Sequence, residues 1–309
     1  MSEKNDVEEE DQEEVPSHEG LQKVFALTHE REILESPIDL HLPKATAIEL
    51  PPLEWHHMEV EPKRVKLTNS GHTVIYSAKW IQDRPCVSGG PFTDNYVFSQ
   101  LHFHWGNNNM CGSEHTISGV SQILEMHMVY FKSCYQSQES ASQRKDGIAM
   151  IVYIFKLQDE INEMLQVIIQ ALPLIKEPHS STRLRSHALG KYMAQFEDDY
   201  FLYAGSINTT TCVHYVLWLI SRVPMGVSMA QVEGFRLLMG ADGALLSRNF
   251  RDVQPLVDRT LYHVNPSGQM HSTLIIMQKE VDTTIQRTHQ TNKYPRSSHE
   301  YSDPTGTTI

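Results

Sequence analysis

Two short histidine runs in this sequence could together hold a metal ion. His102 and His104 are two positions apart, and side chains at positions i and i+2 of a β-strand point to the same face, so both imidazoles could bind one ion. Further along, Glu125 and His127 share one face of a second strand-like run. Three neutral histidines leave one position of a tetrahedral zinc ion open for water, which is typical of a catalytic site, whereas a structural site is closed by a fourth ligand.

Polar groups lie where they could orient these imidazoles. A zinc-bound histidine usually donates its other ring N–H to a carboxylate, an amide or a carbonyl. Gln100 precedes His102 by two positions, and Glu125 precedes His127 by two, so each is on the face of its histidine. The chain contains 17 histidines, which makes one His-x-His pair expected by chance. Ordinary core or surface histidines are therefore the alternative interpretation of the spacing.

Strands dominate the segment that must position these residues. Short β-like runs alternate with turn-rich pieces, and two segments, 161–171 and 228–239, have helical character, the second with Ser228 as its N-terminal cap. The runs that we expect to be strands are residues 73–76, 96–98, 148–155 and 215–220. This pattern predicts an α+β, sheet-dominated domain over residues 35–266 with peripheral helices. We expect the charged residues 1–34 and the polar residues 267–309 to be disordered.

Charge and cysteine usage exclude several function classes. The 309 residues have a net charge of −12, which disfavours nucleic-acid binding. Residues 1–14 carry eight acids against one lysine, so −7 of that charge lies there, and a protein partner for this segment is unknown. Four scattered cysteines predict neither a disulfide scaffold nor a thiolate zinc site. No apolar run approaches the length of a membrane helix, and we expect a cytoplasmic protein without a membrane partner.

Around the histidines, the sequence resembles the α-class carbonic anhydrases over about residues 35–265. The matching runs keep that family's order and spacing: residues 36–39, 70–72, 89–91, 100–106, 112–116, 125–127, 203–206, 218, 249–251 and 254–256. The resemblance implies a large, twisted, mostly antiparallel sheet. It also implies Zn²⁺ as cofactor, bound by His102, His104 and His127, and reversible hydration of carbon dioxide to bicarbonate and a proton.

The resemblance also assigns roles around the ion. His72 matches the family's proton shuttle, and a group that titrates near neutral pH is what the export of a proton requires. Glu114 matches the buried acid that orients the residue in contact with the attacking oxygen. Asn249 falls in the family's supporting positions behind the ligands, together with Gln100 and Glu125. The implied carbon dioxide pocket comprises Val129, Met150, Ile207, Thr209 and Trp218.

The main departure from the family follows Ile207. Family members continue with Thr-Thr-Pro-Pro, and the first threonine donates to the buried glutamate and accepts from the attacking hydroxide, whereas this chain has Asn208-Thr209-Thr210-Thr211. An asparagine amide can also donate and accept, but it is longer and planar. Loss of such a preorganised contact commonly costs on the order of 10² to 10³ in rate. We therefore expect a catalytic Asn208 and a weakened enzyme, unless a local shift brings Thr209 into the role.

Two other functions stay open at this stage. A carbonic anhydrase-related protein of low or no activity could act through an interaction surface, and Asn208 favours this interpretation while the three intact ligands oppose it. A zinc hydrolase of activated esters is a third, which a narrow pocket disfavours. Met150 stands where the family has a pocket valine, and it would narrow the carbon dioxide site further.

Overall fold

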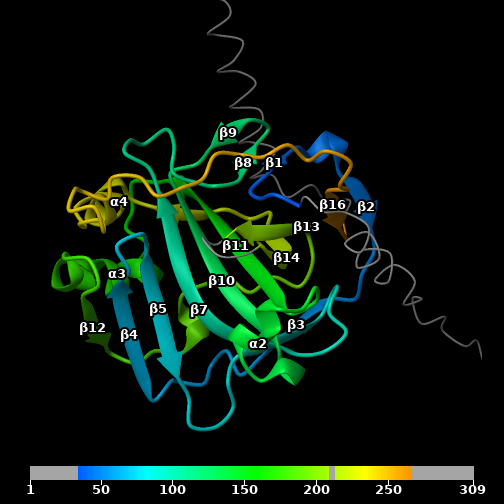
Figure 1. Cartoon of the computed structure of the whole chain (residues 1–309), viewed down its shortest axis with the longest axis horizontal. Coiled ribbons are helices and arrows are strands. Elements are labelled where there is room, and N and C mark those ends of the chain that lie inside the picture. Colours follow the sequence, from blue (N-terminus) through cyan, green and yellow to red (C-terminus); the bar gives the residue numbers. More distant parts are fainter. Residues whose placement is uncertain (1–33, 209–212, 266–309) are drawn as a thin grey trace, which may run out of the picture.

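The computed structural model describes residues 34–208 and 213–265. Residues 1–33, 209–212 and 266–309 are outside it, so the expectations for the two terminal segments and for Thr209 fall beyond the described residues. The described chain is built mainly of strands with a few short helices, which confirms the predicted sheet-dominated α+β class (Figure 1).

The strands occur in chain order with long central members. Their bounds are β1 (Asp39–Leu40), β2 (Thr46–Ile48), β3 (Leu53–His56), β4 (Arg64–Asn69), β5 (Val74–Lys79), β6 (Cys86–Gly89), β7 (Tyr96–Trp105), β8 (Thr116–Ile117), β9 (Val120–Ser121), β10 (Leu124–Lys132), β11 (Ile148–Leu157), β12 (Ser181–Leu184), β13 (Tyr200–Asn208), β14 (Val213–Ser221), β15 (Met225–Val227) and β16 (Tyr262–Val264). The helices are α2 (Gln138–Ser142), α3 (Glu163–Ala171) and α4 (Met229–Arg236). The 3-10 turns are η1 (Leu42–Lys44), η2 (Ser133–Tyr135), η3 (Leu172–Ile175) and η4 (Leu189–Lys191).

One 13-stranded sheet forms the body of the domain, in the order β12-β4-β5-β7-β10-β11-β14-β13-β16-β2, with β15, β3 and β6 attached beside it. Most neighbouring pairs are antiparallel, and β11 pairs in parallel with β14. The long strands β7, β10 and β11 run side by side through the middle of the molecule (Figure 1). A small second sheet, β1-β8-β9, lies at one end.

Strand alternation separates the two faces of this sheet. Phe103 and Trp105 of β7 and Met126 of β10 point to one face and pack against α3 and α4 in the larger hydrophobic cluster. Val129, Met150 and their neighbours point to the opposite face and form the smaller cluster. The histidines of β7 and β10 alternate with the first group, so they belong to the second face.

Both helices are shorter than the sequence pattern predicts. The segment expected from residue 161 begins as α3 at Glu163, because the Asn162 side chain accepts hydrogen bonds from the backbone N–H groups of residues 164 and 165 and so caps the helix. The predicted cap Ser228 does begin α4, in a capping box with Gln231. That helix ends at Arg236 instead of residue 239, because residue 239 forms a β-bridge with residue 245.

Candidate metal centre and active site

The three predicted ligands meet on the second face of the sheet. His102 of β7 is the direct cross-strand partner of His127 on β10, and His104 follows two residues along β7. The ring centroids lie 5.2 Å apart for His102 and His104, 5.1 Å for His102 and His127, and 4.5 Å for His104 and His127. One ligand atom from each residue lies within 4.8 Å of the other two. A single ion can therefore contact all three imidazoles.

Hydrogen bonds fix which nitrogen of two ligands remains for a metal. His104 Nδ1 lies 3.0 Å from the backbone oxygen of Asn249, and its Nε2 is buried without a hydrogen-bond partner among the described residues. His127 Nε2 lies 2.5 Å from Glu125 Oε1, which leaves Nδ1 as its metal-binding atom. A buried, unpartnered imidazole nitrogen aimed at two other imidazoles fits a metal, because an unsatisfied buried acceptor is otherwise costly.

Gln100 makes no hydrogen bond to His102, although its place in the sequence predicts one. Gln100 lies on the expected face, since it is in register with Val129, but its Oε1 and His102 Nδ1 are both buried without a partner in the described part of the chain. The structure thus places the two residues on one strand face and does not join them. The expected role of Gln100 stays a prediction.

Glu125 is the centre of a buried network that supports His127. Its Oε1 also lies 2.7 Å from His115 Nδ1, and its Oε2 accepts a 2.9 Å hydrogen bond from the His115 backbone N–H. His115 Nε2 in turn lies 2.8 Å from the Tyr203 hydroxyl, which donates to Ser36 Oγ at 3.1 Å. His115 and Glu125 are 0% exposed. Since both ring nitrogens of His115 are hydrogen-bonded, this cluster is a support for the metal centre.

Sequence reasoning did not give His115, Tyr203 or Ser36 a role. Ser36 and Tyr203 are 167 residues apart in the chain, and no local pattern predicts their contact. The available signal was position: His115 directly follows Glu114, and Tyr203 opens one of the matching runs.

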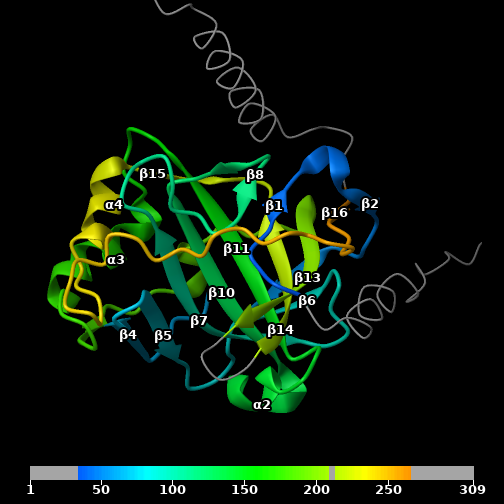
Figure 2. The ribbon, with the colours of Figure 1, turned by 45° about the horizontal axis from the view of Figure 1, so that its top comes forward.

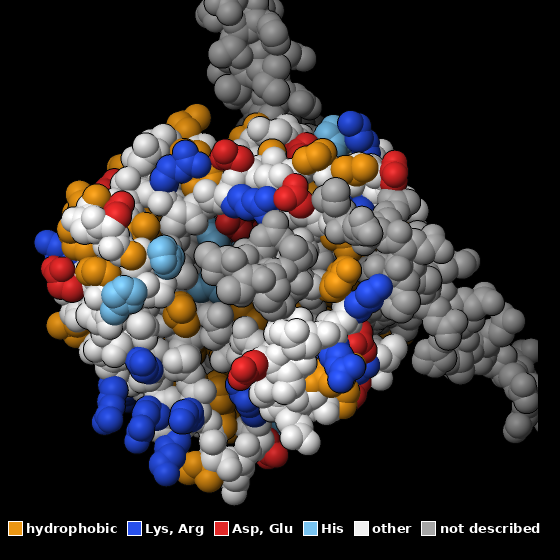
Figure 3. Space-filling view, in the orientation of Figure 1, with side chains coloured by type: hydrophobic (Ala, Val, Ile, Leu, Met, Phe, Trp, Pro, Cys, Tyr) orange, Lys and Arg blue, Asp and Glu red, His pale blue; other side chains and the backbone are white. Residues whose placement is uncertain are grey.

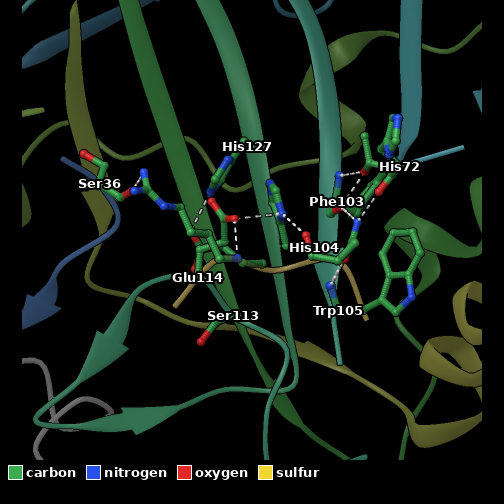
Figure 4. Close-up of polar contacts among 12 residues, drawn as sticks. Ser36, His72, Phe103, His104, Trp105, Ser113, Glu114 and His127 are labelled. Atoms are coloured by element: carbon green, nitrogen blue, oxygen red, sulfur yellow. Dashed lines mark hydrogen bonds and ion pairs between the residues drawn. The ribbon is translucent and has the colours of Figure 1, made fainter. Parts of the chain in front are cut away.

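Glu114 lies at the edge of the centre. Its Oε1 is 3.2 Å from His104 Nδ1 and accepts a 2.9 Å hydrogen bond from the Arg251 backbone N–H. The Arg251 side chain donates to the backbone oxygen of Ser36 and pairs with Glu35. The segment that precedes β16 therefore holds Glu114, which is labelled in Figure 4, through the Arg251 backbone. Figure 2 shows this segment, drawn in orange, crossing one face of the sheet between α4 and β16.

Asn249 joins the metal centre to the loop that carries His72. Its side-chain amide donates to the backbone oxygens of His72 and Phe103, and its Oδ1 accepts from the Trp105 backbone N–H at 2.7 Å. His72 itself is exposed in the turn between β4 and β5 (Figure 4). An exposed imidazole beside the ligand strand can exchange protons with solvent, which a shuttle needs.

The predicted substrate wall is apolar where the structure describes it. Val129, Met150 and Trp218 lie in one register row across β10, β11 and β14, and all three are buried. Ile207 packs against the same cluster. Asn208 is the last residue of β13 and the backbone partner of Val213; its side chain, like Thr209, lies outside the described atoms.

Burial and nearby imidazoles favour the neutral form of two of the ligands, His102 and His127. The pKa of His102 is well below its ordinary value because of burial, with the neighbouring His127 and His104 adding to the effect. Burial also lowers the pKa of His127. For Glu125, burial acts to raise the pKa, but the charge and hydrogen bonds of His115 and His127 outweigh it and hold the pKa well below the usual range. Neutral imidazoles are the form that binds a metal.

These pKa shifts predict acid sensitivity of the metal-free protein. Below about pH 6.5, His102 and His127 bind protons in the unfolded chain but not in the folded protein. The free energy of unfolding therefore falls as the pH drops. Each such proton contributes a slope of about 1.4 kcal/mol per pH unit. Urea unfolding with a chelator, between about pH 7.5 and 5.5, measures this slope.

Two variants make that measurement specific. His102→Gln removes one of the two titrating groups, so the slope should fall by the contribution of one proton, about 1.4 kcal/mol per pH unit. The matched control is His72→Gln, which removes an exposed histidine outside the buried cluster. A level unfolding free energy across this range in the parent would contradict the prediction.

Comparisons with known proteins agree with this geometry. The profile of the eukaryotic-type carbonic anhydrases matches residues 28–265. The chain belongs to this carbonic anhydrase family. It is 31% identical to mouse (Mus musculus) carbonic anhydrase 4 over 211 residues, which cover 67% of each chain, and 30% identical to mouse carbonic anhydrase 6 over 257 residues, 80% of each. Rat (Rattus norvegicus) mitochondrial carbonic anhydrase 5B is 33% identical over 198 residues, 62% of each chain.

Family membership supports hydration of carbon dioxide as the general chemistry of this chain, with carbon dioxide and bicarbonate as substrates. Carbonic anhydrases generally use zinc, and the histidine triad provides the matching donor set. No helix in the described ranges combines the length and apolar character needed to span a bilayer.

Proposed function

We propose that this protein is a zinc-dependent carbonic anhydrase that interconverts carbon dioxide and bicarbonate at a reduced rate. The observation that carries the proposal is the convergence of the three ligands within 4.8 Å, with one nitrogen of His104 and one of His127 already held by hydrogen bonds. When bound, zinc supplies a water whose pKa is lowered to about 7, a value established for carbonic anhydrase, and so a nucleophile at neutral pH.

The described residues would each contribute to this reaction. His102, His104 and His127 hold the ion, with Glu125 behind His127. The apolar row of Val129, Met150 and Trp218 excludes water beside the centre and suits an uncharged, nonpolar substrate (Figure 4 shows the polar side of the same centre). Each hydration releases one proton, and His72 accepts it at an imidazole nitrogen and passes it to buffer.

The reduced rate rests on Asn208. The family's threonine relays orientation from the buried glutamate to the attacking oxygen, and Glu114 has one accepting oxygen engaged by Arg251, so it is held in a fixed position for such a relay. An asparagine amide in place of that threonine is longer and planar, so it alters the geometry of the contact. A carbonic anhydrase-related protein without useful activity is the second candidate, and this same substitution favours it.

The deciding experiment is stopped-flow carbon dioxide hydration on the full chain, with zinc counted per protein. We expect zinc near one equivalent and turnover clearly above the uncatalysed rate, abolished by a chelator and restored by Zn²⁺. A zinc-loaded protein at the uncatalysed rate would overturn the proposal in favour of the related binding protein. Turnover of activated esters that exceeds carbon dioxide turnover would favour a hydrolase.

Substitution of the shuttle gives a separate prediction. In the Asn208→Thr background, where the chemical step is no longer expected to be slow, His72→Ala should lower kcat by about 10- to 100-fold in dilute buffer, because general acid–base groups contribute about 10²- to 10⁴-fold and buffer takes over part of that role. The ratio kcat/KM should stay within about twofold, since proton export follows the chemical step. Free imidazole should restore kcat.

The matched control for this variant is His179→Ala, which removes an exposed histidine on the connection between η3 and β12. It should change neither constant. If His72→Ala keeps its full kcat in weak buffer, another group exports the proton or chemistry is slow enough to hide its export.

A further inference from the structure

Five exposed cations gather on one side of the domain. Arg64 and Lys66 belong to β4, Lys79 to β5 and Arg183 to β12, and Arg185 follows β12 directly. We call these five residues the basic wing. Figure 3 shows blue side chains gathered at the lower left of the molecule, where β4 and β5 lie in Figure 1. The chain as a whole is acidic, so this concentration of positive charge opposes its average.

Strand register places these cations against one another on a single sheet face. Lys66 is the direct partner of Arg183, and Arg64 is the direct partner of Lys79. The alternate residues Val65 and Leu67 are buried on the other face. Like charges directly opposite one another destabilise a sheet, so the arrangement carries a cost that some compensating contact should offset.

The basic wing continues the face that carries the metal centre. Lys66 pairs with Ser77, Ser77 pairs with Gln100, and His102 follows on the same side of β7. Neighbouring strands lie about 4.8 Å apart, so Lys66 is roughly 10 Å across the sheet from the strand of the ligands. Anything bound on the wing would lie beside the active site.

No acidic residue in the described ranges forms an ion pair with any of the five cations. Charges on an exposed edge strand can serve to prevent sheet-to-sheet association, and β12 is such an edge. That explanation covers Arg183 but not Lys66, Arg64 or Lys79, which lie one and two strands further in. The wing therefore has the character of a binding surface for an anion of extended shape.

We propose that the acidic segment of this same chain, residues 3–14, docks on the basic wing. This segment has eight acids against one lysine, which complements five cations. Nineteen residues separate Glu14 from Leu34, the first described residue, and roughly 20 peptide units reach at most about 70 Å. A compact domain of this size has a radius of gyration of about 17 Å, so every part of its surface is within reach.

Because segment 3–14 is part of the same chain, several weak contacts are enough to hold it on the basic wing. Exposed ion pairs are individually weak and are screened by salt, but a connected segment is present at an effective concentration in the millimolar range. The docking must therefore weaken steeply as ionic strength rises, because the Debye length falls from about 30 Å at 0.01 M to about 3 Å at 1 M. Salt dependence is the signature that separates it from an apolar contact.

Zero-length carbodiimide cross-linking with peptide mass spectrometry tests the proposal on the full chain. The reagent joins a carboxylate to a lysine amine only when the two are in contact. We expect segment 3–14 to couple to Lys66 and Lys79 at about 20 mM salt, and this coupling to fall at least about fivefold at about 500 mM. Lys44 is the internal control, because it is exposed, closer to the segment along the chain and outside the wing.

A second set of variants keeps both lysines that the reagent couples and tests whether the charge of the wing causes the coupling. Arg64→Gln, Arg183→Gln and Arg185→Gln together should lower coupling to Lys66 and Lys79 by at least about fivefold. The matched control, Arg144→Gln with Lys145→Gln, removes exposed charge near α2 and should leave the coupling unchanged. Circular dichroism of each variant verifies the fold.

Three outcomes would overturn the proposal. The first is coupling to Lys44 as frequent as coupling to the two wing lysines. The second is coupling that the three arginine substitutions do not reduce. The third is found by mixing ¹⁵N-labelled and unlabelled protein: cross-links that join labelled to unlabelled peptides would assign the wing to the acidic segment of a second copy, and not to its own chain.

Discussion

Replacing Asn208 by threonine should raise the rate of carbon dioxide hydration per bound zinc by about 10²-fold, up to about 10³-fold. The substitution supplies the hydroxyl that the family has at this position, which donates to the buried glutamate and accepts from the attacking oxygen. Glu114 can accept a hydrogen bond from this hydroxyl, because a 2.9 Å hydrogen bond from the Arg251 backbone N–H fixes the position of its carboxylate. The gain is expected in kcat/KM, since the contact acts on the transition state.

The backbone at residue 208 can accept this substitution. Asn208 ends β13 next to Ile207, which packs in the apolar cluster with Trp218. A threonine is shorter than asparagine and favours strands, so the backbone of β13 should tolerate it. Any gain in rate would therefore arise from the new side chain and not from a rebuilt strand.

Two controls separate the explanations. Asn208→Ala has neither hydroxyl nor amide and should stay at or below the rate of the parent protein, with the same zinc content. Thr209→Val tests the local shift: if Thr209 already takes the family role, the parent is fast, Asn208→Thr changes little and Thr209→Val loses about 10²-fold. That pattern would show that our prediction of a weakened enzyme is wrong.

The sequence predicted the parts of the centre that depend on strand alternation. The two-residue spacing of His102 and His104, and of Glu125 and His127, placed four side chains on one face, and the structure brings them together there. Alternation is a local property of the backbone, so spacing alone was enough. The choice of nitrogen was not predictable, because it depends on the Asn249 carbonyl, which is 145 residues from His104.

The sequence pattern did not predict the ends of the helices or the long-range hydrogen bonds that support the metal centre. The start of α3 is decided by the Asn162 side chain and the end of α4 by a bridge to residue 245, and both outweigh periodicity. The chain from Glu125 through His115 to Tyr203 joins three separated strands or loops. Only the register of the folded sheet brings them into contact.

Removing a ligand should lower zinc affinity more than removing its support. His104→Ala leaves two imidazoles, and since structural zinc sites with four ligands bind with about 10–16 kcal/mol, one ligand represents roughly 3 kcal/mol, or on the order of 10²- to 10³-fold. Hydration activity at limiting zinc should fall in parallel. Competition with a chelating dye at pH 7.5 gives the affinity, and stopped-flow assays give the rate.

Glu125→Gln is the graded comparison for that experiment. It keeps the size of the side chain but removes the charge that faces His115 and His127, and second-layer changes of this kind typically cost about 10- to 100-fold in metal affinity. The expected order is therefore parent, then Glu125→Gln, then His104→Ala. Because the carboxylate is 0% exposed and serves two imidazoles, its loss should also lower the stability of the metal-free protein. If His104→Ala binds zinc as tightly as the parent, the metal is held elsewhere, and the histidine triad is not the metal centre.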